Sequence, residues 1–332
     1  MKSTAATDTR KWDSVVEIRN AVKYFDQKHA VSLFKKKTKR VYALNDVSFS
    51  LKKGEFAAYA GPNGAGKSTT FKLLSGMLRP QSGEVSVFGM NPTDKRIEVM
   101  KKTGVLFGNR SELWWDHPVK ASFEWKKAVW DINDAVYKRA LTELTELLDL
   151  NDLLSVFARE LSLGQRMRAN LALTLLHEPE LVLLDEPTLG LDVLAKRQMI
   201  EFLKKVNREK QVTILVTSHD MDDLTEMASR ILLINQGKIA FDGEYEKLIS
   251  MTGDRRIIKI TSGNERRDIE NLEYIGPEDG KHLYAYDAGQ VSVQKIFASV
   301  AACEGVTDVE IGREDIEKVI ARLYSAWKKE EK

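Results

Sequence analysis

Apolar residues along the chain occur in two patterns, short continuous runs and helically spaced stretches, in the order typical of an α/β protein. Continuous runs predict buried strands at 54–60 (GEFAAYA), 181–187 (LVLLDEP) and 213–219 (TILVTSH). The stretch TFKLLSGML, 70–78, has three- and four-residue apolar spacing and predicts a helix. Runs without polar alternation are typical of parallel strands covered on both faces, so the predicted fold class is α/β.

The pattern changes again further along the chain. Helical spacing at 142–154 indicates a helical insertion. After about residue 253, RRIIKIT, LYAYD and VTDVEI are predicted strands, while VSVQKIFASVAA and REDIEKVIARLYSAWKK are predicted helices. We therefore expect a domain at 1–250 with a helical subdomain at about 117–160, and a small α/β domain at 251–332 with a dimerisation or regulatory role.

Composition adds limits to this picture. With 43% hydrophobic and 30% charged residues and a net charge of +2, the chain has globular composition and is not a polycation seeking nucleic acid. We expect no membrane span and no secretory signal, hence a cytosolic chain, and the single Cys303 excludes an internal disulfide. The basic run FKKKTKR, 34–40, is predicted to be a solvated loop; the alternative is an amphipathic piece on anionic lipid.

GPNGAGKST at 61–69 has the spacing of a phosphate-binding loop. It connects a predicted strand to a predicted helix, so backbone N–H groups and a helix N-terminus converge where a polyphosphate fits. Lys67 is expected to reach the β- and γ-phosphates, and Ser68 to offer its hydroxyl to Mg²⁺. The candidate nucleotide ligands are Gly61, Pro62, Asn63, Gly64, Ala65, Gly66, Lys67, Ser68 and Thr69.

Two adjacent carboxylates end the predicted strand LVLLDEP. Open α/β sheets bind ligands at the carboxyl ends of their strands, so Asp185 is placed to hold Mg²⁺. Glu186 is then positioned to activate a water molecule as a general base. A capping or turn role for the pair is the alternative, and the phosphate loop in the same chain disfavours it.

Three further motifs follow in order: LSLGQ at 161–165, TLGLD at 188–192, and His219 after a predicted strand. With the phosphate loop and the carboxylates, they resemble the nucleotide-binding subunits of ATP-binding cassette (ABC) transporters over roughly residues 15–250. The resemblance implies a P-loop cassette with a RecA-like core, an antiparallel β subdomain and a helical subdomain. It also implies ATP hydrolysis that powers transport.

The resemblance implies roles for individual residues of the signature motif. Ser162, Gly164 and Gln165 lie at the start of a predicted helix, where they would bind the γ-phosphate held by a second subunit. Leu163 stands where the family usually has glycine. Since the contacts come from Ser162 and backbone groups, we expect the role to survive this change.

Other family roles fall on single residues. By resemblance, Asp192 organises the dimer seam, and His219 contacts the γ-phosphate and the attacking water. Phe25 is the predicted adenine-stacking aromatic, in preference to Tyr24. A structural role for His219, and core packing for both aromatics, are the alternatives.

In LFGNRSELWWD, 106–116, Asn109 takes the place of a family glutamine that contacts Mg²⁺ or the attacking water. Asparagine keeps the carboxamide but is one methylene shorter, so we expect a catalytic and metal-contacting role in weakened form. Trp114 and Trp115 are predicted partner-interface anchors, with one of them expected in the helical core. This run is similar to cassettes of the branch that exports drugs, viologens and daunorubicin.

The overall prediction is an ATP-hydrolysing subunit that powers export of a small molecule. Its expected partners are a membrane-spanning permease and a second cassette, identical or a sister chain, with no nucleic acid. It would lie on the cytoplasmic face of the cell membrane. One alternative is a soluble cassette ATPase acting on ribosomes or nucleic acid, which the single cassette without coiled-coil heptads disfavours. Another is an ATP-dependent dimerisation switch with little hydrolysis, which Asn109 keeps open.

Overall fold

The computed structural model describes residues 14–32, 35–108, 111–218, 220–251, 255–262, 268–314 and 316–330. The chain divides into two compact units, Met1–Asp242 and Gly243–Lys332. Within the described part of the chain, no helix has both the length and the apolar character needed to cross a membrane.

A six-stranded sheet in the order β5-β6-β7-β3-β8-β9 is the centre of the first unit. The strands from β5 to β8 run parallel, and their central members are buried along their whole length. This confirms the prediction of parallel, fully covered strands. The bounds are β5 (Thr103–Phe107), β6 (Leu181–Asp185), β7 (Thr213–Thr217), β3 (Phe56–Ala60), β8 (Arg230–Asn235) and β9 (Lys238–Glu244).

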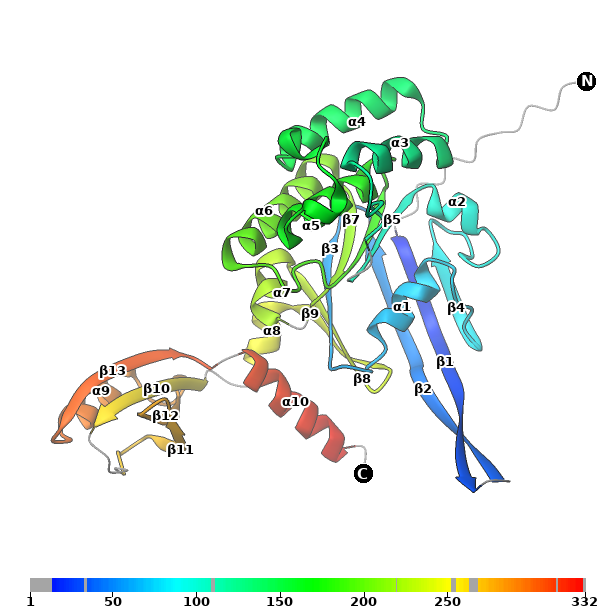
Figure 1. Ribbon diagram of the computed structural model, residues 1–332. Helices are drawn as coiled ribbons and strands as arrows, with labels where there is room; N and C mark the ends of the chain where they lie inside the picture. Colours follow the sequence, from blue (N-terminus) through cyan, green and yellow to red (C-terminus); the bar gives the residue numbers. More distant parts are fainter. Residues whose placement is uncertain are drawn as a thin grey trace, which may run out of the picture. The chain divides into compact units, whose positions relative to one another are not determined.

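Helices cover both faces of this sheet (Figure 1). On one face lie α5 (Leu163–Leu175), α6 (Val193–Lys210) and α7 (Met221–Met227). On the other face lies α1 (Lys67–Leu74), whose buried Phe71 and Leu74 belong to a core shared by the parallel sheet and a second, antiparallel sheet. The α1 helix therefore joins two layers.

The helix predicted at 70–78 was placed wrongly, since α1 begins at Lys67 and ends at Leu74. Gly76 follows with a positive φ of 68°, and a Cβ there would lie 2.0 Å from the carbonyl oxygen of Pro92. The chain turns sharply at this glycine, which helical spacing alone does not reveal. Met77 and Leu78 therefore lie beyond the helix.

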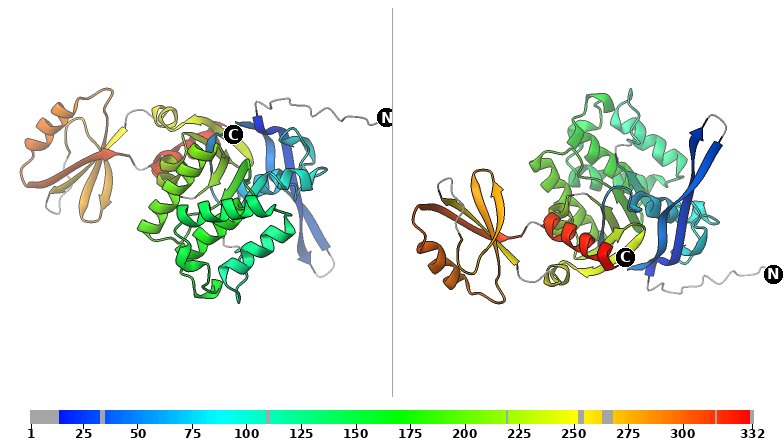
Figure 2. Two further views of the ribbon diagram at one scale, coloured as in Figure 1. Left: turned by 90° about the horizontal axis from the view of Figure 1, so that it is seen from above. Right: turned by 90° about the horizontal axis from the view of Figure 1, so that it is seen from below.

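The antiparallel sheet has the order β2-β1-β4, with β1 (Ser14–Ser32), β2 (Lys35–Lys52) and β4 (Ser82–Val87). Its β1–β2 hairpin projects beyond the rest of the unit, as the blue ribbons of Figures 1 and 2 show. Residues 35–40 belong to β2, so the predicted loop was wrong. Pairing with β1, for example between Asp26 and Arg40, satisfies the backbone of this basic run, and lysines are common on edge strands.

Short helices fill the region between β4 and α5. Asn133 caps α4 by accepting a hydrogen bond from the backbone N–H of Ala135 at 2.9 Å. The bounds are α2 (Arg96–Met100), α3 (Val119–Val129), α4 (Asp134–Leu147), and the 3₁₀ turns η1 (Asn151–Leu153) and η2 (Ala158–Glu160).

The second unit begins with α8 (Tyr245–Ser250) and contains an antiparallel sheet in the order β11-β12-β10-β13. Ile258 and Tyr284 face α9 and form a core with Ile296 of that helix. The predicted strands and helices are all present, but the edge strand β11, which contains Pro277, was missed. The remaining bounds are β10 (Arg255–Ser262), β11 (Glu273–Glu278), β12 (Lys281–Asp287), α9 (Val293–Ala301), β13 (Val306–Arg313) and α10 (Ile316–Glu330).

Candidate nucleotide site

The carboxyl ends of three parallel strands lie side by side at one edge of the sheet. The register pairs Phe107 of β5 with Asp185 of β6, and Asp185 with Thr217 of β7. The neighbouring strand β3 ends at Ala60, directly before the phosphate loop. Residues separated by more than a hundred positions in sequence therefore meet at one edge of the sheet.

The phosphate loop has a backbone that requires glycine. Gly66 has a φ of 120°, and a Cβ there would lie 2.4 Å from the carbonyl oxygen of Ala43. Gly64 also has a positive φ, 79°, but a Cβ there would meet no atom within 4 Å. The backbone at Gly64 is thus open to a close-approaching ligand, while Gly66 packs against the hairpin as α1 starts.

Lys67 is folded into the loop, with 8% of its surface exposed. Its Nζ donates to the carbonyl oxygen of Gly61 at 2.5 Å. Burial lowers the pKa of Lys67, and the nearby carboxylates of Glu186 and Asp185 oppose that shift. The ammonium therefore lies between the loop and the two acids that the sequence predicts to be functional.

Asp185 receives two side-chain hydrogen bonds. The hydroxyl of Ser68 donates to Oδ2 at 3.1 Å, and that of Thr217 donates to Oδ1 at 2.7 Å. Ser68 and Asp185 therefore present two oxygen ligands at one point, which fits a Mg²⁺ ion that takes one or two protein ligands and fills its shell with phosphate and water oxygens. Thr217 was not a predicted site residue; only its place at the end of a predicted strand signals it.

Glu186 has a strained backbone, with a φ of 59° in the left-handed region. Its backbone N–H donates to two atoms of Thr217, the carbonyl oxygen at 3.1 Å and the side-chain hydroxyl at 3.0 Å. Non-glycine residues adopt this conformation at a cost of about 1–3 kcal/mol, and such strain concentrates at functional sites. The strand end thus fixes Glu186 in an unfavourable backbone conformation beside Lys67.

Ser162 and Gln165 form a capping box at the start of α5. The Ser162 Oγ accepts from the Gln165 backbone N–H at 3.3 Å, and the Gln165 Oε1 accepts from the Ser162 N–H at 2.9 Å. Because the Ser162 Oγ is an acceptor in this capping box, its hydroxyl proton can still donate a hydrogen bond to another group. A Cβ on Gly164 would lie 3.3 Å from the Cβ of Ala195, so the turn also packs close to α6.

Asp192 is the N-cap of α6 and accepts from the backbone N–H of Ala195 at 2.9 Å. Between these caps and α7 lies an ion-pair network that the sequence did not reveal. Lys196 contacts Asp220 at 2.6 Å and Asp223 at 3.0 Å, and the Thr188 hydroxyl donates to Asp223 at 2.8 Å. These contacts tie the segment after Glu186 to the start of α7.

Two predicted catalytic residues, Asn109 and His219, lie outside the described residues. Gly108, which precedes Asn109, and Asp220, which follows His219, both take part in hydrogen bonds. Gly108 donates its N–H to the carbonyl oxygen of Asp185 at 2.8 Å. Asp220 caps α7 and accepts from two backbone N–H groups of its first turn. The loop that contains Asn109 therefore begins beside Asp185, and the loop that contains His219 ends at the start of α7.

The predicted aromatics differ in exposure. Phe25 is 42% exposed, while the ring of Tyr24 is covered by the Arg40 guanidinium, 3.9 Å from the ring centre. Trp114 and Trp115 are 39% and 51% exposed, so the expectation that one of them lies in the core was wrong. The segment at 111–117 runs along the surface of α5 and its preceding turn, which leaves both rings partly outside.

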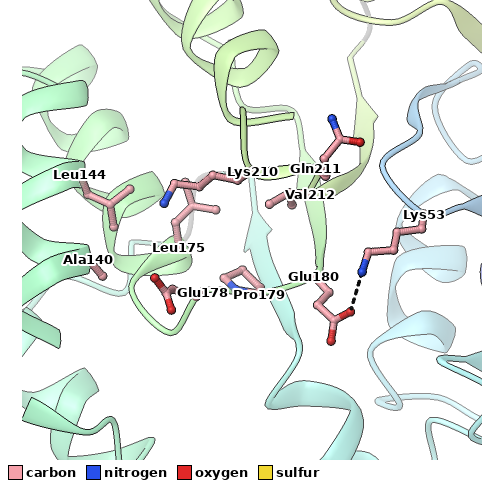
Figure 3. A pocket seen from close by; sticks show the side chains of 10 residues that line it. All are labelled: Lys53, Ala140, Leu144, Leu175, Glu178, Pro179, Glu180, Lys210, Gln211 and Val212. Atoms are coloured by element: carbon pink, nitrogen blue, oxygen red, sulfur yellow. Dashed lines mark ion pairs between the residues drawn. The ribbon is translucent and has the colours of Figure 1, made fainter. Parts of the chain in front are cut away.

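A separate pocket of about 320 Å³ lies at the opposite edge of the same sheet, where β6 and β7 begin (Figure 3). Its walls include Leu144, Leu175 and Val212, and Lys53 and Glu180 form an ion pair at its rim, 3.7 Å apart. This pocket is not the nucleotide site, because the phosphate loop follows the other end of the strands.

The parallel sheet, the glycine loop with its lysine, and the paired carboxylates define a P-loop nucleoside triphosphatase. A family model described as "ABC transporter" matches residues 44–189. The ABC transporter ATP-binding protein NatA of Bacillus subtilis (strain 168) is 31% identical over 215 residues, covering 65% of this chain and 87% of NatA. The chain therefore belongs to the ATP-binding subunits of ABC transporters, and it is an ATPase.

Two other relatives are named for different transport roles. The probable multidrug ABC transporter ATP-binding protein YbhF of Escherichia coli (strain K12) is 35% identical over 208 residues, covering 62% of this chain and 35% of YbhF. The zinc uptake system ATP-binding protein ZurA of Listeria innocua is 28% identical over 260 residues, covering 77% of this chain and 96% of ZurA. The family thus includes uptake systems.

Among solved structures, the dimeric, post-hydrolysis state of the ATP-binding cassette MJ0796 bound to ADP and Pi matches with a TM-score of 0.59 and 25% identity. The match covers 69% of this chain and 98% of that one. The cassette fold predicted from the motifs is therefore confirmed.

Proposed function

We propose that this chain powers the export of a small molecule through a separate membrane-spanning subunit, by ATP-driven dimerisation on the cytoplasmic face of the membrane. The observation that carries the proposal is the meeting of Ser68, Asp185, Glu186 and Thr217 beside Lys67. This cluster supports the proposal because the residues predicted to bind nucleotide and to activate water meet at a single edge of the sheet.

The residues divide the chemistry among them. The phosphate-loop N–H groups and Lys67 bind the phosphates of ATP, with the pyrophosphate at the α1 N-terminus. Ser68, Asp185 and, by the family resemblance, Asn109 would hold Mg²⁺, and the ion would neutralise phosphate charge when bound. Glu186 acts as general base and orients the attacking water, with His219 as its predicted partner. Thr217 holds both acids in place.

A second cassette completes each site in this proposal. Ser162, Gly164 and Gln165 at the start of α5 would bind the γ-phosphate of the partner's ATP through a hydroxyl proton and backbone N–H groups. The solved dimer of MJ0796 supports this arrangement. Phe25 offers an exposed ring for adenine, and Asp192 lies on the loop that would face the partner.

The membrane partner would dock on a surface formed by Trp114, Trp115 and Trp125. All three rings are at least 39% exposed, and Trp114 and Trp125 lie 5.7 Å apart between ring centres. Aromatic clusters of this kind are common interface anchors. The multidrug role in the name of YbhF supports export, as does the resemblance of this segment to drug exporters.

The two parts of the chain would then serve different purposes. Residues 1–250 act as the cassette, with a helical subdomain at about 117–160. Residues 251–332 act in dimerisation or regulation in this proposal; the described part of their sheet and helices contains none of the nucleotide-binding motifs of residues 1–250.

Affinity purification from detergent-solubilised host membranes tests the proposal. The bait is Glu186→Gln with Mg·ATP, and Lys67→Ala is the control that should not close into a dimer. A polytopic membrane protein in stoichiometric amount is expected with the first variant. Ribosomes, nucleic acid or no membrane protein would contradict the transporter role.

A matched pair of variants locates the docking surface. Trp115→Ala should reduce recovery of the membrane protein at least tenfold, because interface anchors dominate binding. Phe297→Ala removes an equally exposed aromatic of the second unit, 50% against 51%, and should leave recovery unchanged. Equal recovery with both variants would place the docking surface elsewhere.

A further inference from the structure

Asn170 lies in the middle of α5, 5% exposed, and its carboxamide makes three hydrogen bonds. Its Oδ1 accepts from the Ser111 hydroxyl at 3.2 Å and from the Glu112 backbone N–H at 2.9 Å. Its Nδ2 donates to the carbonyl oxygen of Arg166 at 3.0 Å. One buried side chain therefore fastens the segment after β5 to the helix that begins at the signature motif.

A second contact holds the same segment from the other side. The ammonium of Lys126 on α3 is 6% exposed and pairs with the Glu112 carboxylate at 2.9 Å. It also lies 4.8 Å from the centre of the Trp130 ring. Because a buried ammonium without its partner is costly, this ion pair holds Glu112 against α3.

The residues that precede Asn109 are also held by backbone pairing. Phe107 pairs in register with Asp185, and Gly108 donates to the Asp185 carbonyl oxygen. The described ends of the loop are thus anchored at two places: to the strand end that carries Asp185 and Glu186, and to α5 through Asn170.

We propose that Asn170 is a positioning residue that sets the segment at Ser111 and Glu112 on α5, and through it the reactive geometry at Asp185 and Glu186. The proposal rests on the proposed roles of those two acids and of Ser162. Asn170 follows Ser162 by about 12 Å along one rigid helix, at 1.5 Å per residue. Asn170 therefore links the helix that begins at the signature motif to Ser111 and Glu112 of the same subunit.

Asparagine suits this position because it accepts and donates at once. Asn170→Leu keeps the size but leaves the Glu112 N–H without its acceptor. Asn170→Asp keeps the acceptor for Ser111 and Glu112, loses the donation to Arg166 and adds a negative charge at a buried position. Thr174→Val is the matched control, since its buried hydroxyl bonds the Asn170 carbonyl oxygen at 2.9 Å on the same helix without reaching the loop.

The test measures steady-state ATPase of the full chain together with hydrogen exchange of the Glu112 amide. For Asn170→Leu we expect kcat to fall ten- to a hundredfold, the size associated with displacement by about an ångström at a reacting centre. KM should change less than threefold, because the phosphate loop is untouched. Exchange at Glu112 should accelerate at least tenfold. Asn170→Asp should keep kcat within threefold of the wild type and retain slow exchange.

Three results would overturn the positioning role. One is a wild-type kcat in Asn170→Leu. Another is an equal loss of kcat in Thr174→Val, which would indicate general weakening of α5. The third is unchanged exchange at Glu112 in Asn170→Leu. Failure of the transporter role would instead show in the co-purification experiment, with these ATPase and exchange differences intact.

Discussion

The two ends of β6 and β7 differ in how they satisfy polar groups. At the carboxyl ends, Asp185, Glu186 and Thr217 share a compact set of hydrogen bonds and a strained backbone. At the amino ends, Glu180 is held by exposed lysines at 3.4 and 3.7 Å around an apolar pocket. Exposed pairs contribute only about 0–1 kcal/mol each. The same strands thus carry the proposed catalytic groups at their carboxyl ends and exposed ion pairs around an apolar pocket at their amino ends.

The largest difference between the two ends should be seen in kcat when two threonines of β7 are compared, Thr217 at its carboxyl end and Thr213 at its amino end. Thr217→Val removes a donor to Asp185 and one of the two acceptors of the Glu186 N–H. Because both acids then lose support, we expect kcat for ATP to fall about ten- to a hundredfold. Steady-state ATPase measures this change.

Thr213→Val is the control at the other end of the strand. Its fully buried hydroxyl accepts from the Gly54 N–H at 3.0 Å. Leaving that donor unsatisfied should cost about 1–3 kcal/mol of unfolding free energy with kcat unchanged. If Thr213→Val slows hydrolysis as much as Thr217→Val, the contrast between the two ends is wrong.

A smaller effect concerns the pair formed by Glu112 and Lys126. Glu112→Gln leaves a buried ammonium without its counter-charge, whereas Lys126→Met replaces that ammonium by an apolar chain and leaves a carboxylate that is 42% exposed. We expect Glu112→Gln to lower the unfolding free energy by about 1–3 kcal/mol and Lys126→Met by less. Urea unfolding measures both. The reverse order would show that Lys126 is stabilised mainly by Trp130.

His177 supplies an effect that appears only as the pH is lowered. It stacks on Trp130 with ring centres 4.4 Å apart, and burial, reinforced by the Lys126 charge, lowers its pKa from 6.5 to about 4. A histidine with a depressed pKa stabilises the fold above its unfolded pKa, and this stability is lost as the pH falls toward the folded value.

We therefore expect the wild type to lose on the order of 2 kcal/mol more than His177→Phe between pH 6.5 and pH 4. Phenylalanine keeps the stacking and does not titrate. Chemical unfolding at several pH values measures the difference. Parallel curves for the two proteins would show that His177 is not the titrating group.

Local pattern predicted the strands and most helices because each depends on near neighbours. The strands β6 and β7 were therefore predicted where they occur, although they end at Asp185 and Thr217, two residues earlier than predicted. Two features needed distant residues: the strand at 35–40 depends on pairing with β1, and the end of α1 depends on Gly76 meeting Pro92. The edge strand β11 was missed because Pro277 is typical of a strand break.

In the candidate site, too, some residues could be predicted from local motifs and others depend on distant contacts. Motifs with fixed spacing identified the phosphate loop and the two acids. Asn170, Lys126 and Thr217 act through partners that lie 14 to 59 positions away in sequence. An asparagine inside an amphipathic helix gives no sign of which backbone it will hold, because that depends on how α5 packs.

The central claim, that the carboxyl edge hydrolyses ATP, is tested most directly by steady-state Mg·ATP hydrolysis of wild type and Glu186→Gln, with nucleotide binding measured alongside. The account predicts that Glu186→Gln binds ATP with unchanged affinity and hydrolyses it about a hundred- to ten-thousandfold more slowly, the range expected when a general base is removed. Equal hydrolysis rates in the two proteins would contradict the account.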